Sequence, residues 1–172
     1  VATLENPSFL AKSRDEKTLL AVSEVAHNGN GFVYAFDIEK DTLQLINYQK
    51  TGGEHPCFVT INEQREILVA NYTGGNIGLL TLNNKGVISE LLDIQQHTGK
   101  GTTSRQDAPH AHSAWFHPLK NEIISVDLGT NELWFSKINR TTHKFSFLHP
   151  KTLKLSEGAG PRHVTFHPTN HW

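Results

Sequence analysis

The chain has 172 residues, of which 37% are hydrophobic and 19% charged, and a formal net charge of −1. This composition is that of an ordinary globular chain without the basic excess of nucleic-acid-binding proteins. A nucleic-acid partner is therefore not predicted. No apolar run reaches the roughly 18–20 residues of a membrane span, so a membrane partner is not predicted either. Because Cys57 is the single cysteine, an internal disulfide is excluded and a reducing, cytoplasmic compartment is favoured.

One pattern recurs at intervals of about fifty residues, a period that four short strands and their turns require in a propeller blade. Its second position falls on Pro7, Pro56, Ala111 and Pro161. Helical periodicity is sustained nowhere along the chain. We therefore predict an all-β fold, specifically a β-propeller of four-stranded antiparallel blades.

The repeat makes residues 1–172 one partial propeller with no second domain. Its units are about 6–54, 55–109, 110–159 and 160–172, which gives three blades and the start of a fourth. Propellers close with about four to eight blades. We therefore expect the remaining blades, or an oligomeric partner, to cover the open edges of this piece.

In each complete unit, short segments rich in β-branched, aromatic or leucine residues alternate with turn formers such as Asn and Gly. The expected strands of the first unit are 9–11, 19–24, 32–37 and 43–48. Those of the second are 58–61, 67–71, 77–82 and 88–94, and those of the third are 113–116, 123–127, 133–138 and 145–148.

Extra length lies between the second and third units, in the polar and glycine-containing stretch 95–109. It predicts a long loop, and long loops in compact folds often carry function. The alternative is a solvated connection without a role. Glu24, Asn71 and Asp127 end the second strands of their units, where polar side chains satisfy backbone groups of the following turn. We expect these three residues to be structural.

The third position of the repeat changes its chemistry from copy to copy, through Ser8, Cys57, His112 and Arg162. The first strand of a blade lies nearest the central channel, so these side chains would ring one mouth of it. A neutral imidazole accepts a proton near pH 7, and a guanidinium donates to a carboxylate, a phosphate or an oxyanion. His112 and Arg162 thus suit acid–base chemistry on an anionic substrate; the alternative is a structural histidine and a salt-bridged arginine.

Other histidines lie close to this pair in the sequence. His110 and His112 form a His-x-His pair, but two ligands do not make a metal site and no acidic or cysteine ligand is near, so no metal or other cofactor is predicted. His163 follows Arg162 directly. Because side chains alternate along an extended segment, we expect His163 to point away from the mouth and to pack between blades.

Several stretches resemble the lactonase family of seven-bladed propellers, and they follow the family's order along nearly the whole chain. They include NPSFLA, HPCFVTI, RQDAPHAHSAWFHP and GAGPRHVTFHP. The resemblance implies a hydrolase of carbohydrate metabolism that opens a small anionic sugar lactone of the 6-phosphogluconolactone type without a cofactor. Cycloisomerisation of a muconate-type dicarboxylate, or a non-catalytic ligand-binding propeller, remains an alternative.

Carried over residue by residue, the resemblance places the family's active-site histidine on His112 and its arginine on Arg162. The family's third residue, a glutamate in the strand after GPRH, would lie beyond Trp172. The candidate substrate-binding residues, chosen for their place at the mouth or for their positive charge in the long loop, are His110, His55, Arg105 and Lys100.

Overall fold

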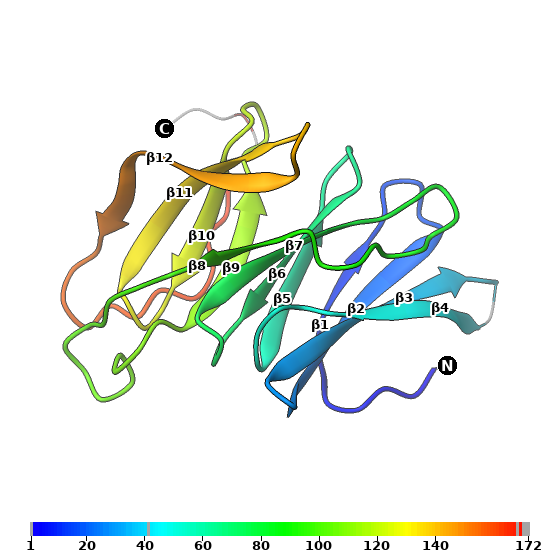
Figure 1. The fold of residues 1–172 in the computed structure, drawn as a ribbon, viewed down its shortest axis with the longest axis horizontal. Coiled ribbons are helices and arrows are strands. Elements are labelled where there is room, and N and C mark those ends of the chain that lie inside the picture. Colours follow the sequence, from blue (N-terminus) through cyan, green and yellow to red (C-terminus); the bar gives the residue numbers. More distant parts are fainter. Residues whose placement is uncertain (1, 41, 168, 170–172) are drawn as a thin grey trace.

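In a computed structural model, which describes residues 2–40, 42–167 and 169, the chain forms three four-stranded antiparallel sheets (Figure 1). Each sheet takes four consecutive strands in order, as a propeller blade does. The all-β expectation is confirmed. This part of the chain contains no helix of the length and hydrophobicity that crossing a membrane would require.

The strands agree closely with the repeat. The first sheet holds β1 (Pro7–Lys12), β2 (Thr18–His27), β3 (Asn30–Ile38) and β4 (Leu43–Lys50). The second holds β5 (Pro56–Ile61), β6 (Glu66–Asn71), β7 (Asn76–Thr81) and β8 (Asp93–Gln96). The third holds β9 (Ala111–Phe116), β10 (Ile123–Asp127), β11 (Glu132–Asn139) and β12 (Lys144–Lys154).

One strand differs from the expectation in the second sheet. The segment 88–94 was expected as its last strand, whereas β8 covers only its end and continues to Gln96. Ile88 makes just an isolated bridge to Leu82. The reason is that the Asn47 side chain, from the first sheet, bonds both the N–H and the C=O of Ile88 at 3.0 and 2.9 Å. Those backbone groups are therefore used for contact between sheets.

A second difference concerns β12, which extends well past the expected strand 145–148. It passes through Pro150, which lacks an N–H donor. Because β12 is the edge strand of its sheet, this missing donor is tolerated. The start of the fourth unit, residues 160–167, forms no strand, and its end at 168 and 170–172 lies outside the described residues.

The second sheet is buried on both faces, and this sets the core. All six residues of β6 are buried, and they alternate between two sides. Ile67 and Val69 pack with Leu20 and other residues of the first sheet. Leu68, on the other side, packs with residues of the third sheet such as Ala114. Two hydrophobic clusters thus join the three sheets in series.

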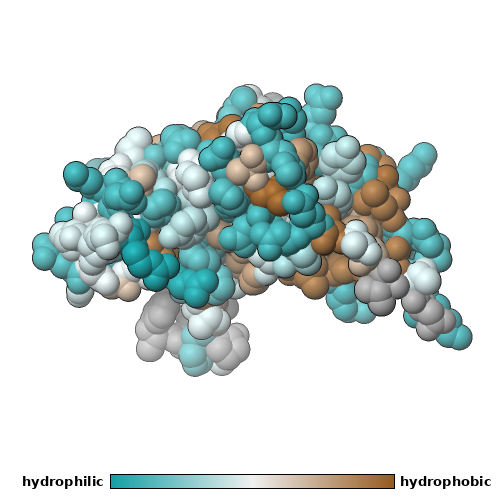
Figure 2. All heavy atoms as spheres, turned by 90° about the horizontal axis from the view of Figure 1, so that it is seen from below, coloured by the Kyte–Doolittle hydropathy of each residue, from teal (hydrophilic) through white to brown (hydrophobic). Residues whose placement is uncertain are grey.

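The outer sheets leave apolar side chains on the surface. In the first sheet Leu10, Leu45 and Tyr48 are each more than half exposed. Figure 2 views the molecule from the lower edge of Figure 1 and shows hydrophobic residues gathered on the right, the side that this sheet occupies. The surface elsewhere in this view is mainly hydrophilic.

The core predicts a large difference between two leucine truncations. Leu68 is fully buried, whereas Leu119 is 71% exposed. Leu68→Ala should lower the free energy of unfolding by about 2–5 kcal/mol, because it removes buried methyl groups and leaves a cavity. Urea denaturation followed by circular dichroism measures this loss. Leu119→Ala is the matched control, and an equal loss in both variants would contradict the burial described.

Candidate active site

The first strands of the three sheets lie next to one another, so the repeat's third positions come together. β1 contacts β5, and β5 contacts β9. Short bonds tie the neighbours: the Ser8 hydroxyl donates to the carbonyl of Pro56 at 3.1 Å, and the Ser113 hydroxyl donates to the carbonyl of Arg162 at 2.8 Å. The third-position side chains, Ser8, Cys57, His112 and Arg162, thus lie together at one end of the first strands.

A cavity of about 500 Å³ opens at this end. Its lining combines two arginines, two imidazoles, one carboxylate, one thiol, one hydroxyl and two aromatic rings. The lining residues are Ser8, Phe9, Glu24, Cys57, Tyr72, Arg105, His112, Arg162 and His163. A concave site with a few convergent polar groups is the usual form of a small-molecule site.

His112 and Arg162 are in direct contact. The Nε–H of Arg162 donates to Nε2 of His112 at 2.9 Å. Since an arginine nitrogen is only a donor, Nε2 must carry the lone pair, and the proton of the neutral imidazole is on Nδ1. Nδ1 faces the thiol sulfur of Cys57 at 3.8 Å. The resting site therefore holds the basic nitrogen of His112 against a guanidinium.

The surroundings keep His112 neutral. Burial is the main cause that lowers its pKa below 6.5, and the positive charges of Arg162 and Arg105 lower it further. These effects outweigh a hydrogen bond to its own backbone, which acts in the opposite direction. The pKa of His163 is lowered as well, first by burial and then by Arg162. Both imidazoles are thus unprotonated at neutral pH.

Cys57 is a thiol rather than a thiolate. Burial, followed by the negative charge of Glu24, raises its pKa to about 12. Its sulfur lies 3.6 Å from the carbonyl oxygens of Ala111 and His112. A thiol with so high a pKa is a poor nucleophile at neutral pH. Its place beneath His112 fits a packing role.

Asp127 holds the beginning of β9, the strand that carries His112. Its Oδ1 accepts the backbone N–H of His110 at 2.9 Å and that of Thr130 at 2.8 Å. Its Oδ2 accepts Nδ1–H of His97 at 2.7 Å, and the His97 ring stacks on Trp134. Burial alone would raise the pKa of Asp127, but His97 and the two amides together lower it. The structural role expected for Asp127 agrees with these bonds.

Gln106 shapes the long loop that brings Arg105 to the cavity. It is 1% exposed, and its amide nitrogen donates to the carbonyl of Leu128 at 3.0 Å. Its amide oxygen accepts the backbone N–H groups of Thr102 and Thr103. The loop is therefore a fixed element beside the cavity, which favours the functional alternative over a solvated connection.

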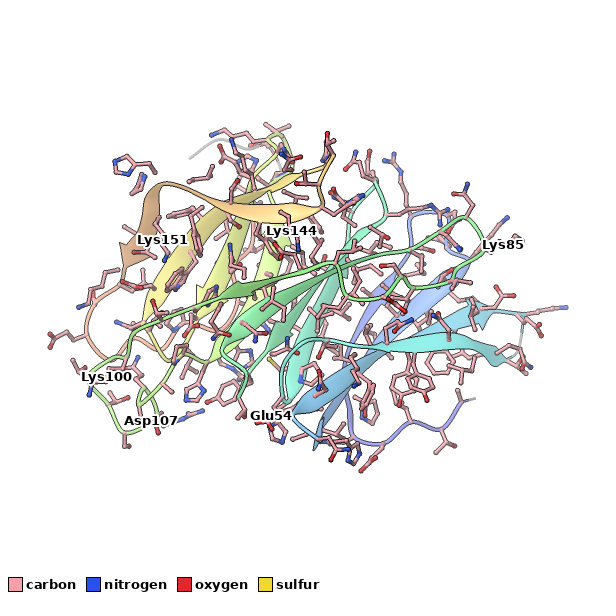
Figure 3. All side chains as sticks on the ribbon, viewed as in Figure 1. Glu54, Lys85, Lys100, Asp107, Lys144 and Lys151 are labelled. Carbon is pink, nitrogen blue, oxygen red and sulfur yellow. The ribbon has the colours of Figure 1, made fainter. Side chains whose placement is uncertain are left out.

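The structure separates the candidate residues into two groups. His112, Arg162 and Arg105 line the cavity, whereas His110, His55 and Lys100 are absent from its lining. The His110 ring stacks on Tyr72 and lies 3.2 Å from Asp107, and His55 lies 2.9 Å from the hydroxyl of Thr73. Figure 3 shows Lys100 on the outer loop, near Asp107. The substrate-binding roles of these three residues remain predictions.

Metal ligands do not gather in the described part of the chain. No group of three or more His, Cys, Asp or Glu side chains lies close enough there to hold an ion. His110 and His112 have different partners, Tyr72 and Arg162.

The expectation for His163 is confirmed in its packing and wrong in its orientation. Its ring packs against aromatic side chains of three sheets, Phe9, Phe58 and Trp115, but it does not point away from the cavity. Residues 160–167 form no strand, so alternation along an extended segment does not apply there. His163 lines the cavity with Arg162 and lies edge-on to His112, with ring centres 5.5 Å apart. Neighbouring Phe9 and Phe58 hold its ring from the side of the first two sheets.

The structural role expected for Glu24 is also wrong, and strand register explains why. Ser23, Asn71 and Asp127 pair with Pro7, Pro56 and Ala111, so they are the equivalent strand ends. Ser23 carries the structural bond of the first blade, to the carbonyl of Glu5 at 2.6 Å. Glu24 is one residue further on and points into the cavity.

The equivalents of Glu24 are Tyr72 and Leu128. In all three blades the backbone N–H of this residue donates to a backbone carbonyl just before the first strand. The acceptors are the carbonyls of Asn6, His55 and His110. Glu24 and Tyr72 both line the cavity. Aligning the blades one residue later would have identified this second cavity-facing position from the sequence.

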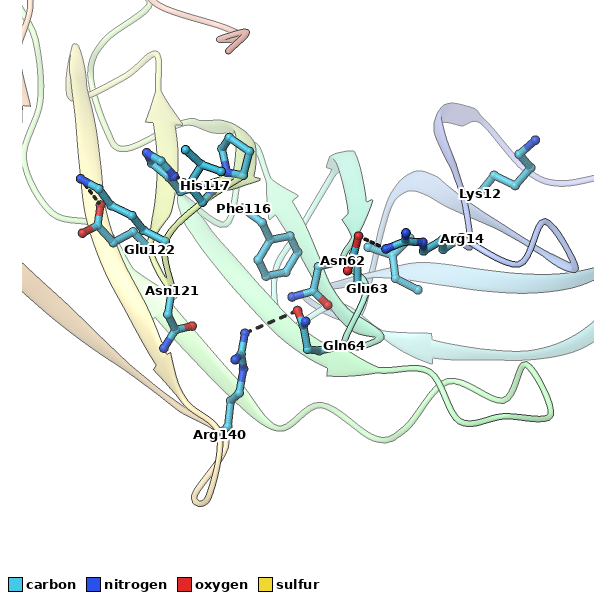
Figure 4. Close-up of a pocket in the computed structure, with 14 residues that line it drawn as sticks. Lys12, Arg14, Asn62, Glu63, Gln64, Phe116, His117, Asn121, Glu122 and Arg140 are labelled. Carbon is cyan, nitrogen blue, oxygen red and sulfur yellow. Dashed lines mark hydrogen bonds and ion pairs between the residues drawn. The ribbon is translucent and has the colours of Figure 1, made fainter. Parts of the chain in front are cut away.

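A larger cavity, of about 640 Å³, lies at the opposite ends of the first strands, among the turns that follow β1, β5 and β9 (Figure 4). Its cations are already matched by carboxylates or amides: Arg14 pairs with Glu63, and Arg140 with Glu66 and Gln64. In contrast, neither Arg162 nor Arg105 forms an ion pair within the described residues. The smaller cavity is therefore better suited to an anionic ligand.

The four-stranded blades bring a histidine of β9 and an arginine of the segment after the third sheet to one cavity. They define the chain as part of a β-propeller with a polar site at one mouth. Comparison with known families agrees with this class. The family model described as "Lactonase, 7-bladed beta-propeller" matches residues 1–172. The chain belongs to this lactonase family.

Similar proteins have consistent names. The chain is 34% identical over 170 residues to the 6-phosphogluconolactonase of Bacillus subtilis, covering 97% of this chain and 47% of that protein. It is 31% identical to the 6-phosphogluconolactonase of Formosa agariphila, with 97% and 49% covered. A crystal structure of a putative 6-phosphogluconolactonase from Bacteroides fragilis has 32% identity and a TM-score of 0.91, with 98% and 49% covered. The chain thus spans about half the length of these relatives.

The Asp127 bonds predict a pH-dependent contribution to stability. Asp127→Asn should lower the free energy of unfolding at pH 7 by on the order of 3 kcal/mol, because it breaks a buried pair. The folded-state pKa of Asp127 is lower than its usual 3.8, so this contribution is present above pH 3.8 and is lost as the pH falls through the folded-state value. Denaturant titrations between pH 3 and 7 measure the difference. The exposed Asp107→Asn serves as control and should lose less; equal losses would contradict the assignment.

Proposed function

We propose that this chain, within a complete seven-bladed propeller, hydrolyses a sugar lactone of the 6-phosphogluconolactone type. The contact between His112 and Arg162, in a cavity lined by two arginines that form no ion pair among the described residues, is the observation that carries this proposal. The names of the relatives support the choice of substrate. The neutral imidazole supplies a base, and the guanidinium supplies a fixed donor.

The proposed reaction begins when the carbonyl oxygen of the lactone accepts hydrogen bonds from Arg162. This frees the lone pair on Nε2 of His112, which then accepts a proton from water as the oxygen of that water bonds to the carbonyl carbon. The carbonyl oxygen becomes an oxyanion held by Arg162. The ring C–O bond then breaks, and the imidazolium returns its proton to the leaving ring oxygen. The product is the open hydroxy acid.

Arg105 is proposed to hold the phosphate or carboxylate of the substrate. It lines the same cavity, and the bonds of Gln106 fix the backbone beside it. A guanidinium suits this task because it presents several donors in one plane. Lys100, His110 and His55 are kept as outer substrate contacts, and the cytoplasm as the compartment, on the basis of the sequence alone.

Two truncations test the chemistry. His112→Ala and Arg162→Ala, each in the complete propeller, should lower kcat/KM for 6-phosphoglucono-δ-lactone by roughly a hundredfold or more, since each removes a group that acts in the transition state. Acid release followed with a pH indicator measures hydrolysis. The controls are His117→Ala and Arg140→Ala, which alter the opposite cavity. Full activity in both site variants, or equal losses in the controls, would overturn the proposal.

The pKa of His112 gives a second test. The neutral imidazole is the active form, so kcat/KM should stay high as the pH falls to 6.5 and decline only below it, through the lowered pKa. Arg162→Gln removes one of the charges that lower this pKa and should move the midpoint of the His112 titration upward, although burial remains. The imidazole signal in NMR spectra reports the midpoint. Arg140→Gln should leave it in place, and a downward shift in Arg162→Gln would contradict the electrostatic account.

A further inference from the structure

Among the residues that the structure describes, Glu24 is the one carboxylate in the lining of the cavity that holds His112 and Arg162. It belongs to β2, whereas those two residues come from β9 and from the segment after the third sheet. Its side chain is half-buried. Glu24 and Cys57 line the same cavity, and the negative charge of Glu24 contributes to raising the pKa of Cys57.

The carboxylate of Glu24 is available for a ligand. Among the described residues its side chain has no hydrogen-bond or ion-pair partner, although its backbone N–H is bonded to Asn6. By contrast, Asp127 in the third blade is saturated by His97 and two backbone amides. The first blade does not need the Glu24 side chain for the structural bond at this point of β2, because the Ser23 hydroxyl donates to the carbonyl of Glu5.

An ionised carboxylate only accepts hydrogen bonds, and hydroxyl groups are natural donors to it. The ring of a sugar lactone carries several hydroxyls, whereas a muconate-type substrate carries a second carboxylate and few donors. A carboxylate at this point of the cavity accepts hydrogen bonds from hydroxyls that reach it, and it disfavours a ligand carboxylate placed at the same point. Arg105 and Arg162 would still bind the substrate's own anionic groups.

We propose that Glu24 is a specificity-determining residue, which accepts hydrogen bonds from the hydroxyls of the lactone ring and disfavours dicarboxylate ligands. This inference rests on the proposed lactone hydrolysis and refines its substrate class to polyhydroxylated lactones. Glu24 acts on binding, while proton transfer stays with His112.

The test compares two ligands of equal charge in the complete propeller: 6-phosphogluconate, and 6-phosphohexanoate, which lacks the hydroxyls. Calorimetric titration gives the Kd of each, and their ratio cancels the general effect of charge. The wild-type protein should prefer the hydroxylated ligand. Glu24→Ala should reduce this preference about tenfold, as expected for the loss of a hydrogen bond to a charged group.

A second variant separates the effect of the Glu24 charge from the effect of its side-chain volume. Because it leaves no cavity, it also tests the proposal if Glu24→Ala fails to fold. Glu24→Gln keeps the size of the side chain but not its charge, so it should bind the dicarboxylate adipate several-fold more tightly than the wild-type protein does. Glu54→Ala and Glu54→Gln are matched controls, because Glu54 lies at the same end of the molecule (Figure 3) without lining the cavity. Both controls should keep the wild-type ratio and the wild-type affinity for adipate.

Either an unchanged ratio in Glu24→Ala or an unchanged adipate affinity in Glu24→Gln would overturn the role of Glu24. Hydrolysis of 6-phosphoglucono-δ-lactone, assayed in the same preparations, keeps the two proposals apart. Normal hydrolysis with an unchanged ratio refutes only the role of Glu24. A shifted ratio in a protein that opens no lactone refutes the hydrolase proposal and leaves Glu24 as a hydroxyl-binding residue.

Discussion

Two-sided burial of the second sheet is the constraint on which the rest of the structure depends. β6 sends alternate side chains to the first and third sheets, so neither neighbour can move away without exposing a hydrophobic cluster. This packing brings β1, β5 and β9 next to one another. Residues that are about fifty positions apart in the sequence consequently meet at one cavity.

The electrostatics of the cavity follow from that packing. Burial keeps His112 neutral, and the neighbouring arginines act in the same direction, so a base is present at neutral pH. The hydrogen bond from Arg162 occupies the basic nitrogen while the site is at rest. A ligand that engages the guanidinium would therefore release the base at the moment of binding. The same environment leaves Cys57 as an unreactive thiol.

Most of the fold could be predicted from the sequence, because periodic strands and turn residues are local signals. The third positions Ser8, Cys57, His112 and Arg162 also follow from the repeat, and all four line the cavity. What the sequence could not show depends on contacts between sheets. The side chain of Asn47 bonds the backbone of Ile88, which therefore does not pair within the second sheet. No local sequence pattern predicts this bond. The orientation of His163 was mispredicted because the segment that carries it forms no strand.

The one-residue offset between Ser23 and Glu24 has a consequence for how such a site evolves. In each blade the residue paired with the start of the first strand makes a structural side-chain bond, and the residue after it differs. Glu24, Tyr72 and Leu128 are an acid, a phenol and an alkyl chain at one equivalent position. Mutation at this position changes the chemistry offered to the channel while the adjacent residue preserves the blade. A repeat built in this way can acquire new ligand preferences blade by blade, without a matching loss of foldability.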